Sequence, residues 1–467
     1  MPLFVRHTPV AAPRQALADW HFRPGVLQRL TPPWDPTTVE RTEGIAEGSR
    51  AVLRVGIGAA RMRMVAEHFD VHPGERFSDR QIEGPFAEWT HEHRFEDAGP
   101  GHSVLSDQIR YGLPLGPVAD SVAGGAVAAR LERTFAYRHR VTAADVARHA
   151  AADLAPMTVA ITGSTGLLGE ALAAFLLSGG HRVVRLVRDR RAAARTQKRP
   201  GERLVYWNVE AGEVDLDRLG RAVPDAVVHL AGASVYGAPT AAHRRRVWES
   251  RVKGTLLLSR ALTRLDRPPR VLLSASATGY YGDRGAVRLP EDAGPGTGFL
   301  PDLCQAWEAA TAEAEAAGIR VAHPRIGVVL SPGGGALGAL APLARLGLGG
   351  WPGRGDSFVP WIALDDVLYA LHHLIAHDDA RGAYNLSAPE PVEMKALVKT
   401  LGHVLGRPTP LRVPDVLVRT VGGRLIREAL ASARVVPDRL LAEGFTFTYP
   451  ALEPALRHLV GRDAPTA

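Results

Sequence analysis

Residues 159–169 read Val-Ala-Ile-Thr-Gly-Ser-Thr-Gly-Leu-Leu-Gly, and this segment sets the fold of the chain around it. Its first residues are apolar or β-branched, which predicts a short buried strand over Thr158–Thr162. Three glycines follow at three-residue spacing, and an amphipathic helix is predicted after them, over Gly169–Ser178. A strand, a glycine turn and a helix in this order predict a βα unit whose backbone approaches a ligand closely.

Each of the three glycines has a physical role in such a unit. Gly163 makes the tight turn, Gly166 lets the backbone approach a pyrophosphate, and Gly169 lets the helix pack against the strand. The first turn of the helix then offers free N–H groups and a partial positive charge to the phosphates. An ordinary βα turn without a ligand is the alternative. We expect a dinucleotide to bind along the whole turn, at Gly163, Ser164, Thr165, Gly166, Leu167, Leu168 and Gly169.

The end of the next strand predicts which dinucleotide binds. That strand is expected at His181–Val187, and Arg188 follows it. NAD enzymes usually place an acid here for the ribose hydroxyls, whereas an arginine suits the additional 2′-phosphate of NADP. Arg188 therefore favours NADP(H), while Asp189, one position later, keeps NAD(H) possible.

Strand-like and helix-like segments alternate over residues 157–395. This alternation predicts an α/β fold of the Rossmann type, a doubly wound parallel sheet with helices on both faces. The Gly-rich run Gly333–Gly338 lacks the Gly-Lys-Ser/Thr of a P-loop and is predicted to be a flexible flap over a substrate cleft. Further strands are predicted at Ala226–Ala231, Arg270–Ala275 and Arg320–Leu330, and further helices at Ala242–Leu265 and Asp302–Ala317.

Two smaller units flank this domain. A break at Ala150–Pro156 separates it from residues 1–150, and residues 396–467 are expected to form a small, mostly helical subdomain with one strand-like run, Gly444–Pro450. Residues 1–150 are predicted to form an α+β domain, a strand-rich sheet closed by a helix over Pro117–Tyr137. Its strands are expected at Phe4–Val10, Ala51–Ile57, Arg61–His68, Phe86–Phe95 and Ser103–Tyr111.

Composition limits the class of protein. Of 467 residues, 46% are hydrophobic and 22% are charged, as in soluble globular proteins, and no apolar run is long enough to span a membrane. The single cysteine, Cys304, cannot form an internal disulfide, and no signal peptide is recognisable, so a cytoplasmic protein is expected. The formal charge of +7 does not indicate nucleic-acid binding, because acidic residues are interspersed. The densest basic run, Arg185–Arg203, is expected to be a solvated loop.

These motifs together resemble the extended short-chain dehydrogenase/reductase superfamily, and within it an atypical branch, the NAD-dependent epimerase/dehydratase-like family. Residues 410–459 resemble the small C-terminal domain of that branch. The motifs that carry the resemblance are Ile161–Gly169, His229–Ala233, Ser250–Thr255, Ser274–Gly282, Pro324–Leu330 and Trp361–Val367.

The resemblance implies positions for the remaining cofactor contacts. Leu230, Ala231 and Gly232 would run beside the adenine and ribose, Asn208 would lie near the adenine, and Ser274 would reach the nicotinamide. Ser276 falls where the superfamily keeps its catalytic serine or threonine; a buried hydroxyl bonded to backbone is the alternative.

The resemblance also exposes a departure from the superfamily pattern. A catalytic tyrosine and a lysine four residues later are expected on the helix after the fifth strand, but alignment places Leu300 and Cys304 there. Tyr280 and Tyr281 lie close to where a substrate carbonyl would sit, so either could donate a proton, with loop packing as the alternative. Arg325 could pair with an anionic substrate or with a neighbouring carboxylate.

Residues 1–150 resemble the START-like, polyketide-cyclase-like helix-grip fold, through Phe22–Trp34, Gly84–His93 and Tyr111–Gly116. That resemblance implies an apolar ligand held between sheet and helix. His91 and His93 share one face of a strand, which suggests a metal, but no third ligand has a diagnostic spacing, so no metal site is predicted.

Two functions follow from these patterns. The first is an NADP(H)-dependent oxidoreductase or epimerase-like enzyme acting on a small, apolar or sugar-like molecule. The second is a non-catalytic sensor in which NADP(H) and an apolar metabolite bind to different domains and affect one another. The missing tyrosine and lysine favour the sensor, and the serine at the strand end favours the enzyme.

Overall fold

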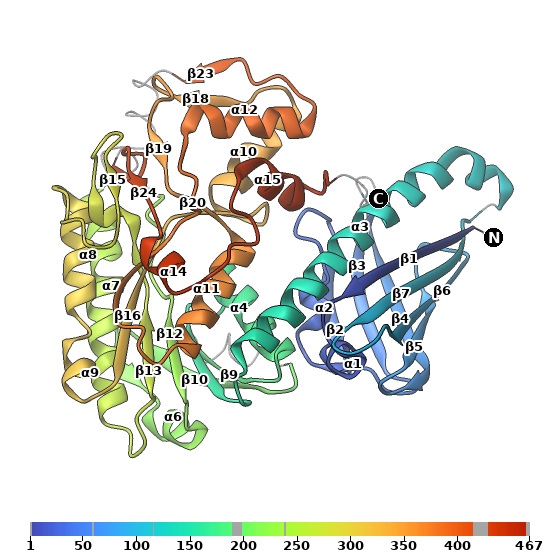
Figure 1. Ribbon diagram of the computed structural model, residues 1–467, viewed down its shortest axis with the longest axis horizontal. Coiled ribbons are helices and arrows are strands. Elements are labelled where there is room, and N and C mark those ends of the chain that lie inside the picture. The colour runs from blue at the N-terminus through green and yellow to red at the C-terminus, as the bar shows by residue number, and fades with distance from the viewer. Residues whose placement is uncertain are drawn as a thin grey trace.

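Two separate β-sheets organise the chain in the computed structural model, which describes residues 2–57, 60–114, 116–188, 199–237, 240–413 and 428–463. The N-terminal sheet and the second sheet lie at opposite ends of the molecule, and one long helix passes between them (Figure 1). Smaller strand pairs and helices of the C-terminal third lie beyond one end of the second sheet. No helix in the described ranges is long and apolar enough to cross a membrane.

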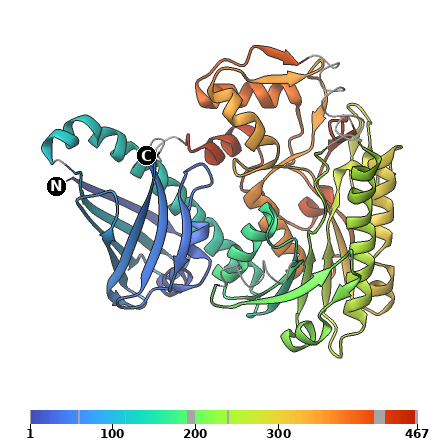
Figure 2. The same cartoon turned by 180° about the vertical axis from the view of Figure 1, so that it is seen from behind.

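The N-terminal sheet is antiparallel, with seven strands in the order β1-β7-β6-β5-β4-β3-β2. Helix α3 (Pro117–Ala152) runs along it, accompanied by the short helices α1 (Arg14–Phe22) and α2 (Val26–Arg29) (Figure 2). The sequence pattern missed the second and fifth strands and predicted a shorter helix than α3, which extends to Ala152. The strands are β1 (Leu3–Val10), β2 (Thr38–Thr42), β3 (Arg50–Ile57), β4 (Ala60–His72), β5 (Arg76–Glu83), β6 (Glu88–Asp97) and β7 (Ser103–Gly112).

The second sheet confirms the predicted doubly wound fold. Its main strands run β10-β9-β8-β12-β13-β16-β21 and are parallel, so the order reverses between β8 and β12. In such sheets ligands bind at the carboxyl ends of the strands on either side of this reversal. The strands are β8 (Thr158–Thr162), β9 (Arg182–Val187), β10 (Glu202–Asn208), β11 (Glu213–Val214), β12 (Ala226–His229), β13 (Val271–Ser274), β14 (Ser276–Ala277), β16 (Arg320–Ile326) and β21 (Gly382–Leu386).

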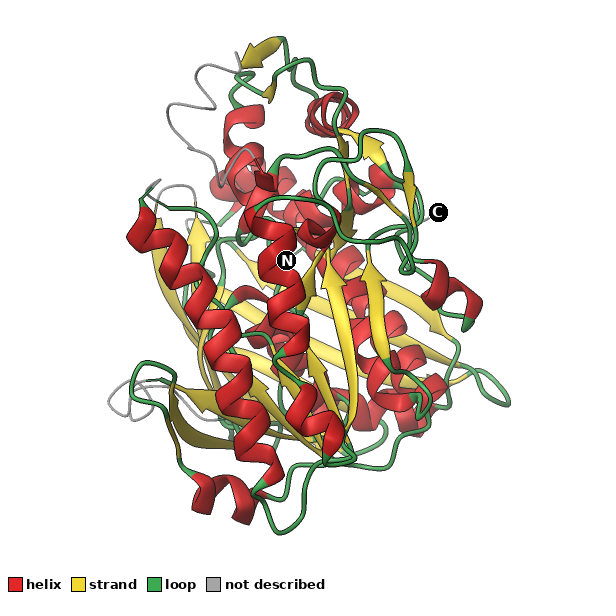
Figure 3. Ribbon diagram, turned by 90° about the vertical axis from the view of Figure 1, so that its left-hand side faces the viewer, coloured by secondary structure: helices red, strands yellow, loops and turns green. Residues whose placement is uncertain are grey.

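Helices cover both faces of this sheet, as Figure 3 shows. Successive residues of a strand point to opposite faces, so Val159 and Ile161 pack in one apolar cluster with α4 and α11, whereas Ala160 packs in another with α6, α7 and α9. The helices are α4 (Leu167–Ser178), α6 (Leu216–Ala222), α7 (Ala241–Thr263), α8 (Phe299–Ala309), α9 (Ala312–Ala316) and α11 (Leu364–Ala376).

The structure corrects two predicted boundaries. The strand expected at Arg320–Leu330 is two strands, β16 and β17 (Val328–Leu330), because the chain changes sheets at Gly327. A Cβ at Gly327 would lie 2.1 Å from the carbonyl oxygen of Pro360, so only glycine fits. The helix expected at Asp302–Ala317 is also two, α8 and α9.

The run Gly444–Pro450 was predicted to be strand-like, and this prediction is wrong. The segment is irregular, and the backbone N–H groups of Thr448 and Tyr449 donate to the Asp366 carboxylate at 2.7 and 2.9 Å. A side chain therefore satisfies the backbone that a neighbouring strand would otherwise pair.

Residues after 391 form strand pairs and an apolar cluster with segments that come earlier in the chain. The short strands β22 (Val392–Glu393), β23 (Leu411–Val413) and β24 (Arg434–Val435) pair with β19 (Phe358–Val359), β18 (Gly350–Pro352) and β15 (Arg288–Leu289), respectively. One apolar cluster joins α12 (Met394–Leu405) and α15 (Leu452–Val460) with α10 (Gly335–Arg345). The other elements of this part are β20 (Trp361–Ala363) and α14 (Asp438–Ala442).

The N-terminal elements dock tightly on the second sheet. Gly25, at the start of α2, lies so close to α4 that a Cβ there would be 2.4 Å from the carbonyl oxygen of Ala174. Arg29 of α2 is buried and pairs with Asp145 of α3 at 2.8 Å and with Asp365 of α11 at 2.9 Å. Removing one carboxylate of such a buried pair leaves a charge poorly compensated, so its loss should destabilise the docking of the two sheets.

Candidate functional site

The glycine turn lies between β8 and α4, at the point where the strand order reverses. Gly163 has φ +64°, and a Cβ there would lie 2.8 Å from the Leu230 carbonyl group at the end of β12. A Cβ at Gly169 would lie 2.3 Å from the carbonyl oxygen of Gly163. The left-handed turn and the two close approaches explain why glycine occupies these positions.

Gly166 is different, because the protein itself leaves room there. Its φ is −86°, and the nearest atom to a hypothetical Cβ is the Gly163 carbonyl oxygen at 3.3 Å. Thr165, Gly166 and Leu167 are exposed. The space beside Gly166 is therefore open to a ligand rather than required by folding.

The start of α4 fits an anionic group. No side chain caps this helix, so its first N–H groups remain free to bind an anion. The Ser164 hydroxyl is buried and has no hydrogen-bond partner in the described part of the chain, and the same holds for Ser274 at the end of β13. Buried polar groups without partners are uncommon, and a bound dinucleotide would supply partners at these positions.

The segment after β12 is held against the glycine turn. The Thr162 hydroxyl accepts hydrogen bonds from the N–H groups of Leu230 and Ala231, at 3.1 and 3.2 Å, and lies 2.6 Å from Nδ1 of His229. Burial lowers the pKa of His229 to about 3, so its ring is neutral. Leu230, Ala231 and Gly232 thus lie beside the turn, as the cofactor prediction requires.

Arg188 is exposed and follows β9 directly. Because Thr162 of β8 is opposite Leu186 of β9, Arg188 and Ser164 each lie two residues beyond the same point of the sheet edge. Asn208, at the end of β10, is half-buried, and its side-chain oxygen accepts from the N–H groups of Glu210 and Ala211. Asp189, the alternative NAD contact, lies outside the described residues.

The basic run Arg185–Arg203 is not simply a solvated loop. Arg185 lies in β9 and Arg199 three residues before β10. Both are buried, and each pairs with Glu170 and Glu202. Arg185 also donates to the carbonyl oxygen of Ser164 in the glycine turn at 2.7 Å. The arginines between Arg188 and Arg199 lie outside the described residues.

Arg251 of α7 is a residue of this site that sequence reasoning missed. Its guanidinium donates to the carbonyl oxygen of Ala233 at 2.8 Å, lies against Gly232 and is 5.0 Å from the centre of the Trp307 ring. Burial lowers its pKa, and in the described ranges it forms no ion pair with a carboxylate. The motif Ser250–Thr255 was the available signal, but the resemblance implied no role for its arginine.

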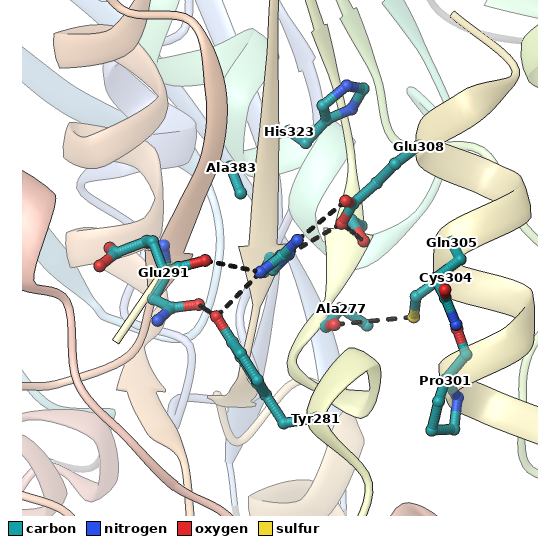
Figure 4. Close-up of polar contacts among 12 residues, drawn as sticks. Ala277, Tyr281, Glu291, Pro301, Cys304, Gln305, Glu308, His323 and Ala383 are labelled. Carbon is teal, nitrogen blue, oxygen red and sulfur yellow. Dashed lines mark hydrogen bonds and ion pairs between the residues drawn. The ribbon is translucent and has the colours of Figure 1, made fainter. Parts of the chain in front are cut away.

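A buried polar network connects β14, the last turn of α8 and the end of β16 (Figure 4). Ser276 donates to Oε1 of Glu308 at 2.7 Å, and Arg325 binds the same carboxylate through Nε at 2.9 Å and Nη2 at 3.0 Å. The structure therefore gives Arg325 a neighbouring carboxylate as its partner, the second of the two predicted options. Sequence reasoning missed Glu308, which lies one helical turn after Cys304 on α8.

The two tyrosines differ sharply. Tyr281 is 0% exposed; its hydroxyl donates to Oδ1 of Asn385 at 2.7 Å and accepts from Arg325 at 3.0 Å. Burial raises its pKa to about 12. Tyr280 is half-buried, and its ring lies 3.5 Å from the carbon of the Arg325 guanidinium. The geometry thus favours Tyr280 over Tyr281 as a group that a substrate could reach.

Leu300 and Cys304, which occupy the usual tyrosine and lysine positions, are both buried on α8. Leu300 packs with Val247 and Leu303, and the Cys304 thiol lies 3.6 Å from the carbonyl oxygen of Ala277. Burial raises the pKa of Cys304 to about 12, so the thiol is not a base at neutral pH.

The segment predicted to be a flap has a defined conformation in the structure. Gly333 and Gly334 form a tight turn closed by a bridge between Ser331 and Gly334, and α10 begins at Gly335. Hypothetical Cβ atoms at Gly333 and Gly334 would contact the Leu167 side chain at 3.5 and 3.6 Å, so this turn lies over the start of α4.

A cavity of about 630 Å³ opens between the N-terminal sheet, α3 and the segment around α2. Its lining is mainly apolar, including Leu53, Met64, Phe77 and Phe135, and it reaches Arg199 and Pro200 of the other half. Asp79, His91 and His93 also line it. The sequence spacing indicated no third ligand for the two histidines, and the fold places the Asp79 carboxylate beside them.

Comparison with known proteins settles the family. A family model described as the NAD dependent epimerase/dehydratase family matches residues 159–387, and one described as a domain of unknown function (DUF1731) matches residues 413–459. The epimerase family protein Mb2239 of Mycobacterium bovis is 38% identical over 311 residues, which are 66% of this chain and 99% of that protein. This chain belongs to the NAD dependent epimerase/dehydratase family. Human SDR39U1, called an epimerase family protein, is 32% identical over 309 residues, 65% of this chain and 100% of that protein.

Two solved structures extend the comparison of this epimerase/dehydratase family member. The nucleoside-diphosphate sugar epimerase from Corynebacterium glutamicum superposes with a TM-score of 0.80 at 32% identity and covers 99% of this chain and 91% of that chain, so its likeness includes the N-terminal sheet. Human SDR39U1, solved with NADPH, superposes with a TM-score of 0.58 at 30% identity, covering 65% of this chain and 99% of that one.

Proposed function

We propose that this epimerase/dehydratase family member is an NADP(H)-dependent oxidoreductase or epimerase-like enzyme. The observation that carries the proposal is the uncapped start of α4 beside Gly166, where space is open to a pyrophosphate and Arg188 lies at the same sheet edge. The NADPH bound to the human relative supports the choice of cofactor, and NAD(H) is the weaker alternative.

The residues that would hold the cofactor each have a defined part. The free N–H groups from Leu167 onward bind the pyrophosphate, Arg188 pairs with the 2′-phosphate, and Leu230–Gly232 and Asn208 lie beside the adenosine. Ser274 reaches the nicotinamide, which supplies or accepts a hydride when bound.

Ser276 and Tyr280 are the proposed groups that contact the substrate. Glu308 orients the Ser276 hydroxyl, and Arg325 holds Glu308 in place. Tyr280 would supply a proton to a substrate oxygen. Because Leu300 and Cys304 occupy the usual tyrosine and lysine positions, we expect turnover to be slow compared with that of relatives that have this acid/base pair.

Titration of nicotinamide fluorescence with the full chain tests the proposal. Gly166→Val should abolish NADPH binding without unfolding the protein, because only the Gly163 carbonyl lies within 3.4 Å of the new side chain's Cβ position. Gly125→Val, on an open position of α3, is the matched control. NADPH binding that survives Gly166→Val would refute this cofactor site. Nucleoside-diphosphate sugars belong first in a substrate screen, since the Corynebacterium relative is named for them.

For residues 1–150 we propose a START-like helix-grip domain that binds an apolar molecule in the 630 Å³ cavity. The volume suits a small apolar ligand, and the lining is mainly apolar. An environment-sensitive lipid probe added to the full chain tests this: Met64→Trp, which fills the cavity, should weaken probe binding, whereas Ile82→Trp on the exposed face of β5 should not. Equal probe binding by both variants would argue against the cavity.

The alternative function, a sensor of NADP(H) and an apolar metabolite, rests on one specific observation. A chain of ion pairs joins the two sites: Arg199 lines the cavity and pairs with Glu170 of α4, Glu170 pairs with Arg185, and Arg185 binds the carbonyl of Ser164 in the glycine turn. A ligand that shifts Arg199 would change the glycine turn through these contacts. If no substrate is turned over but the probe changes NADPH affinity, the sensor is the better description.

A further inference from the structure

We propose that the N-terminal cavity holds a divalent transition-metal ion, most suitably Zn²⁺, bound by Asp79, His91 and His93, with its fourth position open to the apolar cavity. The three residues come from two neighbouring strands, and Asp79 of β5 lies directly opposite His91 of β6 in the sheet register. His93 follows two residues later, so its side chain is on the same face. All three face the cavity.

The ligand atoms of the three residues converge, all within 4.8 Å of one another. Oδ2 of Asp79 lies 3.3 Å from Nδ1 of His91 and 3.8 Å from Nε2 of His93. Donors bound at about 2.0–2.2 Å around tetrahedral zinc are separated by roughly 3.3–3.6 Å. The longer distance exceeds that of a hydrogen bond, so a direct contact between His93 and Asp79 does not explain why these groups converge.

A buried carboxylate stands behind the two imidazoles. Asp107 of β7 places Oδ1 2.7 Å from Nε2 of His91 and 2.8 Å from Nδ1 of His93, and its Oδ2 is 2.5 Å from Nε2 of His139 on α3. Each imidazole therefore turns one nitrogen toward Asp107 and the other toward Asp79. Metal-binding histidines characteristically have this arrangement, because the carboxylate behind them fixes the ring and strengthens the ligand.

The surrounding charges favour a metal ion at Asp79, His91 and His93 over one at a second cluster of histidines. His149, His181 and His372 also bring ligand atoms together between the two sheets, but apart from one another and His373 the charged groups acting on them are Arg23, Arg29 and Arg148. A cation is unfavourable in that positive surrounding. At the cavity, Asp79 and Asp107 supply two negative charges, which balance a divalent ion.

The open coordination position determines which ligands the cavity takes. With three protein ligands, zinc retains a fourth position for water or an oxygen donor. That position would open into a mainly apolar cavity that Arg138 also lines. The matching ligand is an apolar molecule with a carboxylate or another anionic oxygen donor at one end.

The alternative is a metal-free network in which a protonated His91 bridges Asp79 and Asp107. The full chain, stripped with chelator and dialysed, is loaded with Zn²⁺ and its metal content measured by mass spectrometry; Co²⁺ loading reports tetrahedral coordination through its visible absorption. We expect one equivalent of metal and a tetrahedral Co²⁺ spectrum. Failure to retain metal from the wild-type chain would overturn the proposal.

Variants assign the metal to its ligands. His93→Gln and Asp79→Asn should each abolish the Co²⁺ spectrum, and Asp107→Asn should weaken Zn²⁺ affinity by about 10–100-fold. His68→Gln is the matched control, because His68 lines the same cavity but bonds to Ser49. Metal that is lost in His372→Gln and retained in His93→Gln would assign the ion to the other histidines and refute this site. Thermal melting of each variant separates loss of a ligand from loss of the fold.

Discussion

The guanidinium of Arg325 donates a hydrogen bond to the hydroxyl of Tyr281 at 3.0 Å, and the same guanidinium holds Glu308. Tyr281 therefore helps to position Arg325, which binds the Glu308 carboxylate that accepts the hydrogen bond of Ser276. A tyrosine whose hydroxyl already donates to Asn385 and accepts from an arginine has little capacity left for a substrate.

Tyr281→Phe should therefore act mainly on stability. Loss of the hydroxyl leaves Arg325 and Asn385 each short of a buried partner, which costs about 1–3 kcal/mol of unfolding free energy. Tyr280→Phe should leave stability nearly unchanged and reduce any turnover, as should Ser276→Ala. Urea denaturation and initial rates for the three variants measure both effects. Rapid turnover that none of the three changes affects would show that the active site lies elsewhere.

Arg188→Ala should weaken NADPH binding selectively. Loss of a charge-assisted hydrogen bond of about 1.5–3 kcal/mol corresponds to roughly 10–100-fold in affinity, and NADH, which lacks the 2′-phosphate, should bind as before. Arg203→Ala, an exposed arginine on β10, is the control. Equal NADPH and NADH affinities in the wild type would rule out this role of Arg188.

Glu170→Gln should disconnect the cavity from the glycine turn. The amide cannot form ion pairs with both Arg185 and Arg199, so any effect of a bound apolar probe on NADPH affinity should shrink toward none. Glu213→Gln, an exposed acid on β11, is the control. If the probe changes NADPH affinity equally in Glu170→Gln and in the wild type, the two sites do not communicate through these arginines.

Acid should destabilise the contact between the two sheets. Burial lowers the pKa of His181 to about 4 and of His372 to about 3, and it lowers that of His149 as well. Because the unfolded chain binds these protons near pH 6.5 and the folded chain does not, stability is present above pH 6.5 and falls as the pH drops toward 4.

His372→Leu tests this dependence on pH. Other buried histidines also contribute to the wild-type slope, so comparison with the variant isolates the contribution of His372. Between pH 6.5 and 4 the unfolding free energy of the variant should fall less steeply with pH. The difference in slope should correspond to at most one proton bound on unfolding. His102→Leu, at an exposed position, should retain the wild-type slope. Urea midpoints at several pH values give these slopes, and identical slopes in all three proteins would contradict the assignment.

The glycine turn and its place in the sheet could be predicted from the sequence, because they depend on residues close together in the chain. Gly163 and Gly169 are required by a left-handed turn and by close packing within a few residues, so their spacing alone indicated the βα unit and its place in the sheet. Arg188 was likewise placed by counting from the end of a strand. The alternation of strands and helices predicted the parallel sheet, although boundaries failed where distant partners set them, as at Gly327 and Asp366.

Packing between distant elements controls which polar groups meet. Glu308 comes to Ser276 and Arg325 because α8 packs beside β14 and β16, and a spacing of 32 residues between Ser276 and Glu308 carries no signal for that contact. Asp79 and Asp107 join His91 and His93 through the register of three antiparallel strands. The amino-acid order alone is enough for motifs whose chemistry lies within one turn or strand end. Long-range pairing depends on how whole elements pack, so the polar network, the cavity and the ion pairs that connect it to the glycine turn became visible only in the folded chain.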